Sequence, residues 1–162
     1  MSSIRTELSG DTDGLLRRLN QLGSLDIKGA LNAMAEGLRT STVERFTEEK
    51  TPEGTPWKPS ARARDEGGKT LTRTAQLKTS IRSEVSDSGL AVGTNDIRAA
   101  THQFGDKRTI RARNKRYLTF KIGGQWHRAA SVNVSIPARP FLGISKEDEQ
   151  EIRDILEETL EE

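Results

Sequence analysis

A single apolar stripe runs through residues 27–46 of this chain. Its side chains recur at spacings of three and four, which is the period of one face of an α-helix. We therefore expect a long helix from about Asp26 to Glu49, and we assign its inner face to core packing rather than to a cofactor. The stripe consists of Ile27, Leu31, Met34, Leu38, Thr42 and Phe46.

The sequence offers little apolar material with which to cover that helix. Apolar residues make up 32% of the 162 residues, charged residues 31% and aromatic residues only 4%. A chain of this length suits one domain, which we expect to span 1–162, but such a composition buries only a modest core. We therefore expect extended parts, and neighbouring molecules that supply the missing burial.

Alternating apolar residues predict β structure in the middle of the chain. The patterns indicate a strand from Ile4 to Leu8, a hairpin turning at Asp87-Ser88-Gly89, a second hairpin turning at Gly123-Gly124, and a strand that ends at Ile136. Short helices are predicted at 11–22 and 97–104, and a short helix or turn at 71–81.

The last predicted helix begins after Ser145, and Asp148, three positions later, makes the pattern a near relative of the capping box. Its apolar side consists of Ile152, Ile155, Leu156 and Leu160. The order of elements predicts an α+β fold, in which an antiparallel sheet of about four or five strands packs with a long N-terminal helix and a C-terminal helix.

Residues 51–70 contain prolines and glycines that fit neither the helical nor the strand pattern of apolar residues, so they are predicted to form an extended loop. A loop of this length is uncommon in a compact domain unless it is functional. Trp57 lies within it, and two interpretations are open. The side chain packs back under its own domain, or it anchors on a neighbouring subunit.

Charge is separated along the chain, although the net charge is only +2. Carboxylates dominate 147–162, and cations crowd residues 106–116, which we expect to form a loop or hairpin. The cationic run faces solvent, an acidic neighbour or DNA, because burying unpaired cations costs several kcal/mol each. Its six candidate contact residues are Lys107, Arg108, Arg111, Arg113, Lys115 and Arg116.

Signals for chemistry are weak. Gly67-Gly68 and Gly123-Gly124 lack the flanking pattern of a phosphate loop, and no cysteine is present to form a disulfide or bind a metal. His102 and His127 have no partners at metal-ligand spacing, so a small hydrolase built on either is the least supported hypothesis. We predict no catalytic, cofactor or metal site.

The sequence also predicts no membrane partner. No apolar run approaches the roughly 20 residues of a membrane span, and the first five residues lack the apolar stretch of a signal peptide. We therefore expect the chain to be made in the cytoplasm.

A series of landmarks resembles the phage virion morphogenesis family, the tail-completion proteins of contractile-tailed phages that include Mu G-like proteins. The final landmark is the most specific of them. One departure occurs at Thr74-Ala75, where the family usually has Thr-Gly, and this puts only the local turn in doubt. In chain order the landmarks are Phe46, Pro52–Trp57, Leu71–Ile81, Val92–Thr94, His102–Gly105 and Ile136–Gly143.

The resemblance implies a structural, non-enzymatic protein of the virion neck or tail. It implies a role in tail completion, tail termination or head–tail joining. By the same resemblance, the protein would be made in the bacterial host and would assemble as a homo-oligomer, a hexameric ring. The partners would be neck, tail-tube or connector proteins, with genome DNA in the channel. A separate nucleic-acid-binding module that uses 107–116 is the alternative.

Several landmark side chains are candidates for contact with a partner, because large or planar groups anchor interfaces well. For Phe141 and Leu142 the other interpretation is a rigid turn that packs both side chains under the last helix. The interface candidates are Trp57, Phe104, Arg139, Phe141 and Leu142.

Overall fold

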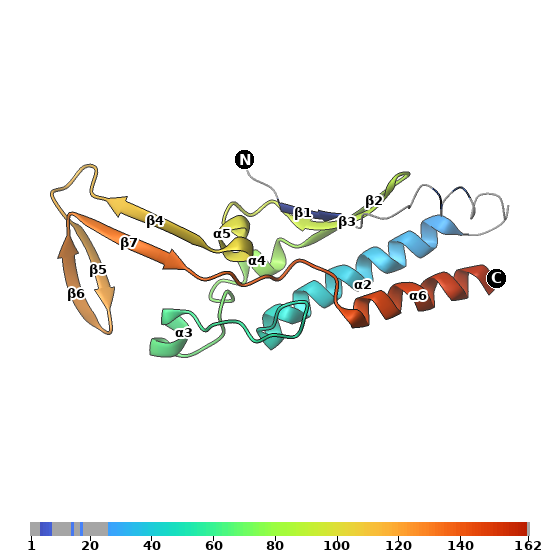
Figure 1. The fold of residues 1–162 in the computed structure, drawn as a ribbon, viewed down its shortest axis with the longest axis horizontal. Helices are drawn as coiled ribbons and strands as arrows, with labels where there is room; N and C mark the ends of the chain where they lie inside the picture. Colours follow the sequence, from blue (N-terminus) through green and yellow to red (C-terminus); the bar gives the residue numbers. More distant parts are fainter. Residues whose placement is uncertain (1–3, 8–13, 15–16, 18–25, 162) are drawn as a thin grey trace.

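A computed structural model describes residues 4–7, 14, 17 and 26–161. Two long helices lie side by side beneath a small sheet at one end of the molecule, and a long β arm extends from the other end (Figure 1). The prediction of an α+β fold is confirmed. The arm is the feature that the helices and the sheet hold in place.

The long helix predicted from the apolar stripe is α2, Ile27–Glu48. The carboxylate of Asp26 caps its first turn by accepting a hydrogen bond from Gly29 N at 2.8 Å. Residue Glu49 ends the helix in a left-handed conformation, with φ of 59°. The buried face includes Met34, Leu38, Thr42 and Phe46 from the predicted stripe.

Three strands form an antiparallel sheet in the order β1-β3-β2. Strand β1 is Ile4–Glu7, β2 is Arg82–Ser86 and β3 is Gly89–Thr94. Strands β2 and β3 form the predicted hairpin, with Ser86 paired to Gly89 across a two-residue turn. The sheet lies against α2, and this places its apolar face on the core.

The arm contains the other four strands. Its stem pairs β4, Asp106–Arg111, with β7, Ser131–Ile136, and its tip pairs β5, Leu118–Ile122, with β6, Gln125–Ala129. All pairs are antiparallel, but the described strands divide among three sheets instead of forming the single sheet that the alternation suggested. Residues 112–117 interrupt the ladder on one side only, so the tip turns away from the stem.

The short helices differ from their predicted bounds. The stretch 51–70 is not wholly a loop, because Ser60 Oγ accepts a hydrogen bond from Ala63 N at 3.1 Å and caps α3, Ala61–Glu66. The short helix or turn predicted over 71–81 is only α4, Gln76–Thr79. Helix α5, Ala99–Phe104, is confirmed with a later start. The helix predicted over 11–22 lies outside the described residues, apart from residues 14 and 17.

The predicted C-terminal helix is α6, Lys146–Glu161, and it packs along α2. Its capping box is present in both directions. Ser145 N donates to Asp148 Oδ2 at 2.7 Å, and Asp148 N donates to Ser145 Oγ at 3.1 Å.

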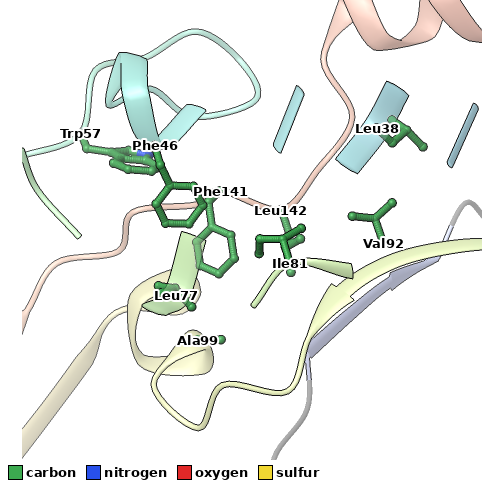
Figure 2. Close-up of a cluster of buried hydrophobic side chains, with 9 residues drawn as sticks. All are labelled: Leu38, Phe46, Trp57, Leu77, Ile81, Val92, Ala99, Phe141 and Leu142. Atoms are coloured by element: carbon green, nitrogen blue, oxygen red, sulfur yellow. The ribbon is translucent and has the colours of Figure 1, made fainter. Parts of the chain in front are cut away.

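The core is a small cluster that draws side chains from α2, α4, β3, α5 and the segments between elements (Figure 2). The Phe46 ring lies 5.4 Å from the Trp57 ring, nearly perpendicular to it, and 5.1 Å from the Phe141 ring, centroid to centroid. Such tilted aromatic contacts are favourable beyond their burial. The other members are Leu38, Leu77, Ile81, Val92, Ala99 and Leu142.

Helix α4 starts late because Ala75 stands at its N-cap in the left-handed region, with φ of 54°. A Cβ makes this conformation costly, and glycine avoids the cost. We therefore predict that Ala75→Gly raises the free energy of unfolding by about 0.5–1 kcal/mol. Urea denaturation measures the change. The control Ala33→Gly, on the exposed face of α2, is expected to lower it by about 1 kcal/mol, and equal effects at both positions would contradict the argument.

Candidate assembly interface

Arg45 is the buried centre of the polar contacts that hold the Ile136–Gly143 segment. Its guanidinium donates to Phe141 O at 2.9 Å and to Gly143 O at 2.8 Å. It also pairs with the Asp148 carboxylate, and both side chains are almost fully buried. A buried cation needs partners of this kind, so α2, the segment and the start of α6 are joined through one side chain.

Gln103 holds the same segment from the other side. Its Oε1 accepts hydrogen bonds from Phe141 N at 3.0 Å and Leu142 N at 3.1 Å, and its Nε2 donates to Leu142 O at 2.9 Å. The side-chain amide thus forms the hydrogen bonds that a neighbouring strand would otherwise form with this backbone. The two prolines in the segment make such side-chain partners necessary, since they cannot donate to a ladder.

Trp57 joins Arg45 and Gln103 to form a clamp on this segment, and its indole Nε1 donates to Pro140 O at 2.9 Å. Arg139 Nε donates to Lys58 O at 2.7 Å. The landmarks that carried the family resemblance therefore contact one another within the chain. Their residue types serve the fold around residues 139–143.

This placement corrects four of the five interface candidates. Trp57, Arg139, Phe141 and Leu142 are buried in their own protomer. Of the two interpretations of Trp57, the structure shows packing under its own domain, and the same holds for Phe141 and Leu142. Phe104 differs, because its side chain is 71% exposed at the base of the arm.

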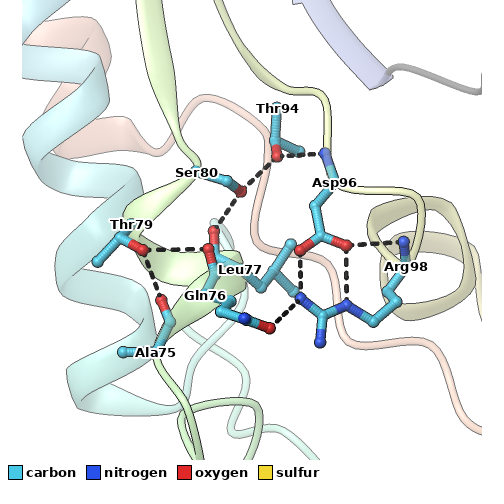
Figure 3. A network of polar contacts seen from close by, with 8 residues as sticks. All are labelled: Ala75, Gln76, Leu77, Thr79, Ser80, Thr94, Asp96 and Arg98. Carbon is cyan, nitrogen blue, oxygen red and sulfur yellow. Dashed lines mark hydrogen bonds and ion pairs between the residues drawn. The ribbon is translucent and has the colours of Figure 1, made fainter.

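A polar network supports the base of the arm (Figure 3). The hydroxyl groups of Ser80 and Thr94 lie 2.6 Å apart, and Thr94 Oγ1 accepts a hydrogen bond from Asp96 N at 3.1 Å. Arg98 Nε donates to Asp96 Oδ1 at 2.9 Å, and this contact lowers the pKa of the Asp96 carboxyl. The network links α4 to the end of β3 and to the start of α5.

Gly105 is the point at which the arm leaves the body. It has φ of 76°, and a Cβ placed there would lie 2.8 Å from Ala138 N and 2.9 Å from Ile136 O. Only glycine combines this conformation with so close an approach of two backbones. The two strands of the stem therefore start side by side, held by the clamp at Phe141.

The predicted cationic run lies on the arm. Lys107, Arg108 and Arg111 are on β4, and the other three candidates follow in residues 112–117. All six are exposed, as expected. Two of them have local partners. Arg108 Nε lies 3.3 Å from Asp106 Oδ2, and the Arg116 guanidinium carbon lies 5.4 Å from the centroid of the Tyr117 ring.

The register gives the stem an apolar face and a polar face. Residues directly opposite each other in an antiparallel ladder point to the same side. Ile110 is opposite Val132, and Arg108 is opposite Val134, so β4 and β7 share an apolar face. The other face carries Lys107, Thr109, Arg111, Ser131, Asn133 and Ser135.

Exposed large apolar side chains gather in the same region. Within the described chain, all of them except Leu160 fall between residues 97 and 126. The sequence had predicted the tip hairpin but gave no reason to single out Ile122 or Trp126, which are 61% and 72% exposed. Alternation alone does not say which strands lack a second layer. The exposed set is Ile97, Phe104, Ile110, Tyr117, Ile122 and Trp126, with Leu160.

The two histidines lie apart. His127 stacks on Phe120 in the tip, with ring centroids 6.0 Å apart. His102 lies at the base of the arm, and its buried Nδ1 has no hydrogen-bond partner among the described residues. Burial, then Arg139 and Arg98, lower the pKa of His102, while Asp96 acts in the opposite direction. The described residues contain no cluster of metal-binding side chains, and none of their helices could cross a membrane.

Comparisons with known proteins match this chain to phage proteins. The model of the phage virion morphogenesis family matches residues 11–161, which is nearly the whole chain. The chain belongs to this family. It is also similar to the Mu-like prophage FluMu G protein 2 of Haemophilus influenzae, with 36% identity over 85 residues. That alignment covers 52% of this chain and 47% of the relative, so it spans about half of the relative's length. No solved structure matches the chain.

Membership of the family makes this a phage virion morphogenesis protein and supports a virion-associated, structural role. The resemblance read from the landmarks is confirmed. The buried clamp brings several of these landmarks together in the fold. They fix the base from which the virion morphogenesis protein extends its arm.

We predict that Asp148→Ala lowers the free energy of unfolding by about 3–5 kcal/mol, because it leaves Arg45 buried without its counter-ion. Ser145→Ala removes only the cap and is expected to cost about 1 kcal/mol. Asp154→Ala, at an exposed position of α6, is the control and should change stability by less than about 0.5 kcal/mol. Chemical denaturation of the three variants measures the series. Equal losses in the first two would show that the ion pair adds nothing to the cap.

We predict that His102 makes the protein less stable as pH falls. The unfolded histidine takes up a proton near pH 6.5, whereas the folded one, with its lowered pKa, does not. Above about pH 6.5, His102 therefore does not change the free energy of unfolding with pH. Below it, that free energy falls by at most about 1.4 kcal/mol per pH unit. Denaturation at pH 7.5 and 5.5 tests this. His102→Asn should reduce the difference between the two pH values, and His127→Asn should retain it.

Proposed function

We propose that this virion morphogenesis protein is a structural component of the phage neck or tail end, which acts in tail completion, tail termination or head–tail joining. It assembles as a ring of its own copies, six by resemblance to tail-end proteins that match a six-fold tube. Neighbouring neck, tail-tube or connector proteins would contact the ring. Family membership supports the virion role, and the arm supports assembly.

The observation that carries the proposal is the uncovered arm. Each two-stranded sheet of the arm packs mainly within itself, and none of the helices that the structure describes covers it as α2 covers β2 and β3. A two-stranded hairpin is marginal in water unless another layer buries its apolar face. Exposed apolar groups concentrated on such a projection mark an interaction surface. Most of the exposed large apolar side chains in the described chain, Ile110, Tyr117, Ile122 and Trp126, lie on the arm, so the arm is the part that most needs a partner.

A second candidate function is binding of genome DNA by the same arm. Lys107 and Arg111 lie on the polar face of the stem, and Arg113, Lys115 and Arg116 follow them. Cations arranged in this way bind phosphates in a salt-dependent manner. Proteins that bind single-stranded nucleic acids stack bases on aromatic side chains placed along a basic groove. In the described arm, Tyr117 is the one aromatic ring beside the cationic run. Protein contact is therefore the stronger candidate.

The two candidates give different results when the charge is reversed. We predict that Arg111→Glu with Arg113→Glu and Lys115→Glu abolishes ring assembly and infectivity while the fold is retained, because all three side chains are exposed. Reconstruction of the neck measures assembly, and circular dichroism measures folding. The control reverses Lys28, Arg73 and Arg153, which are exposed outside the arm.

Intact rings with reduced DNA retention would instead support the DNA candidate. Normal assembly, DNA retention and infectivity in the arm variant would leave both candidates without support. A neck reconstruction that shows a single copy of the protein would contradict the ring.

A further inference from the structure

The tip of the arm presents an aromatic side chain between two cations. In the β5–β6 ladder, Trp126 is opposite Lys121 and Arg128 is opposite Thr119, so these residues share one face. Phe120 and His127 lie opposite each other on the other face and stack there. Trp126 is therefore free of the fold, with 72% of its surface exposed. Tryptophan flanked by cations is a typical anchor of a protein interface.

A cleft of about 750 Å³ opens at the other part of the molecule, between the C-terminal half of α2, residues 50–54 and the start of α6. Pro52 and Ile144 give it an apolar part. Carboxylates dominate its rim. Arg45 also borders it, but the Asp148 carboxylate already neutralises that cation. The acidic side chains are Glu44, Glu48, Glu53, Glu147 and Glu149, and the lysines are Lys50 and Lys146.

We propose that the Trp126 face of the arm tip docks on a second copy of this chain, in the acidic cleft between its α2 and α6. The inference rests on the proposed ring and names the two surfaces that would close it. The tip supplies an apolar anchor with Lys121 and Arg128 beside it. The cleft supplies Pro52 and Ile144 with carboxylates around them.

Charge complementarity is the reason to choose a second copy as the occupant. The cations lie on one projecting end and the carboxylates on the body, so each copy carries both halves of the contact. Among these carboxylates, hydrogen bonds from Thr51 and from its own backbone, followed by the Arg45 charge, lower the pKa of Glu53. Different surfaces on the two partners make a head-to-tail contact, and such contacts generate rings when the rotation closes.

Cross-linking between single-cysteine variants tests the contact, because the chain has no cysteine of its own. Gln125→Cys places a thiol at the exposed tip, and Lys50→Cys places one on the cleft rim without removing a carboxylate. The two purified variants are mixed at low salt and treated with a short bismaleimide. We expect a dimer that contains one copy of each variant, and less of it at high salt because the contact is electrostatic.

Three results would overturn the proposal. One is that Gln125→Cys cross-links to itself in preference to Lys50→Cys. A second is an equal yield when Lys50→Cys is replaced by Thr159→Cys, on the far end of α6. The third is the lack of any mixed dimer up to millimolar protein at low salt. The failure of this inference is distinguishable from the failure of the proposed function. A ring in the neck reconstruction without the mixed cross-link would retain the ring and exclude this contact.

Charge reversal supplies a second test that does not need cysteines. Lys121→Glu with Arg128→Glu reverses the tip, and Glu44→Lys with Glu48→Lys reverses the cleft. Each variant alone is expected to need an at least tenfold higher protein concentration to self-associate. Mixing the two restores it, because every tip then meets a cleft of opposite charge in an alternating arrangement. Self-association that mixing does not restore, as measured by sedimentation, would contradict the pairing.

Discussion

The buried ion pair between Arg45 and Asp148 is the interaction on which the rest of the structure depends. Asp148 belongs to the first turn of α6, and Arg45 to the last turns of α2, so the pair fixes how the two helices meet. The same guanidinium binds two carbonyl groups of the segment between the arm and α6. Since a buried charge is tolerated only with full pairing, each of these elements must be in place for the others to be stable.

Polar clamps of this kind compensate for the small core. With 32% apolar residues, the chain cannot fix the path of residues 136–143 by packing alone. Gln103, Trp57 and Arg45 instead satisfy the backbone groups of that path, and Phe141 then enters the aromatic cluster beside Phe46. The result is a rigid exit for the arm. A precise root matters because a small change of angle there becomes a large displacement at the tip.

Periodicity predicted the elements well and their partners poorly. The stripe from Ile27 to Phe46 specified α2 because its spacing leaves one consistent face, and Ser145 with Asp148 specified the start of α6 through local hydrogen bonds. Alternation predicted β5, β6 and β7 of the arm but not β4, which lies in the stretch 106–116 that was expected to be a loop or hairpin. It could not show that they form separate two-stranded sheets, because alternation fixes which side chains share a face and not what covers that face.

The misplaced side chains have a similar explanation. Trp57 lies between prolines in a stretch with almost no other apolar residue, and sequence offers no local signal that Phe46 and Pro140 meet it across the fold. Arg45 was missed because it stands next to the apolar stripe and looks like an ordinary charged neighbour. Its partner Asp148 is 103 positions away. Contacts of this range are set by the packing of the whole chain, and a single sequence carries no periodic trace of them.

The distribution of charge also limits how copies of the protein can associate. A two-fold pairing of arms would bring the cationic stretch from Lys107 to Arg116 against its own copy, and like charges in contact oppose association. Pairing through α6 would likewise set the carboxylates of 147–161 against each other. The proposed contact between the arm of one copy and the body of another avoids both penalties, and every copy offers both surfaces for it. Electrostatics therefore favours the proposed head-to-tail contact over a symmetric dimer.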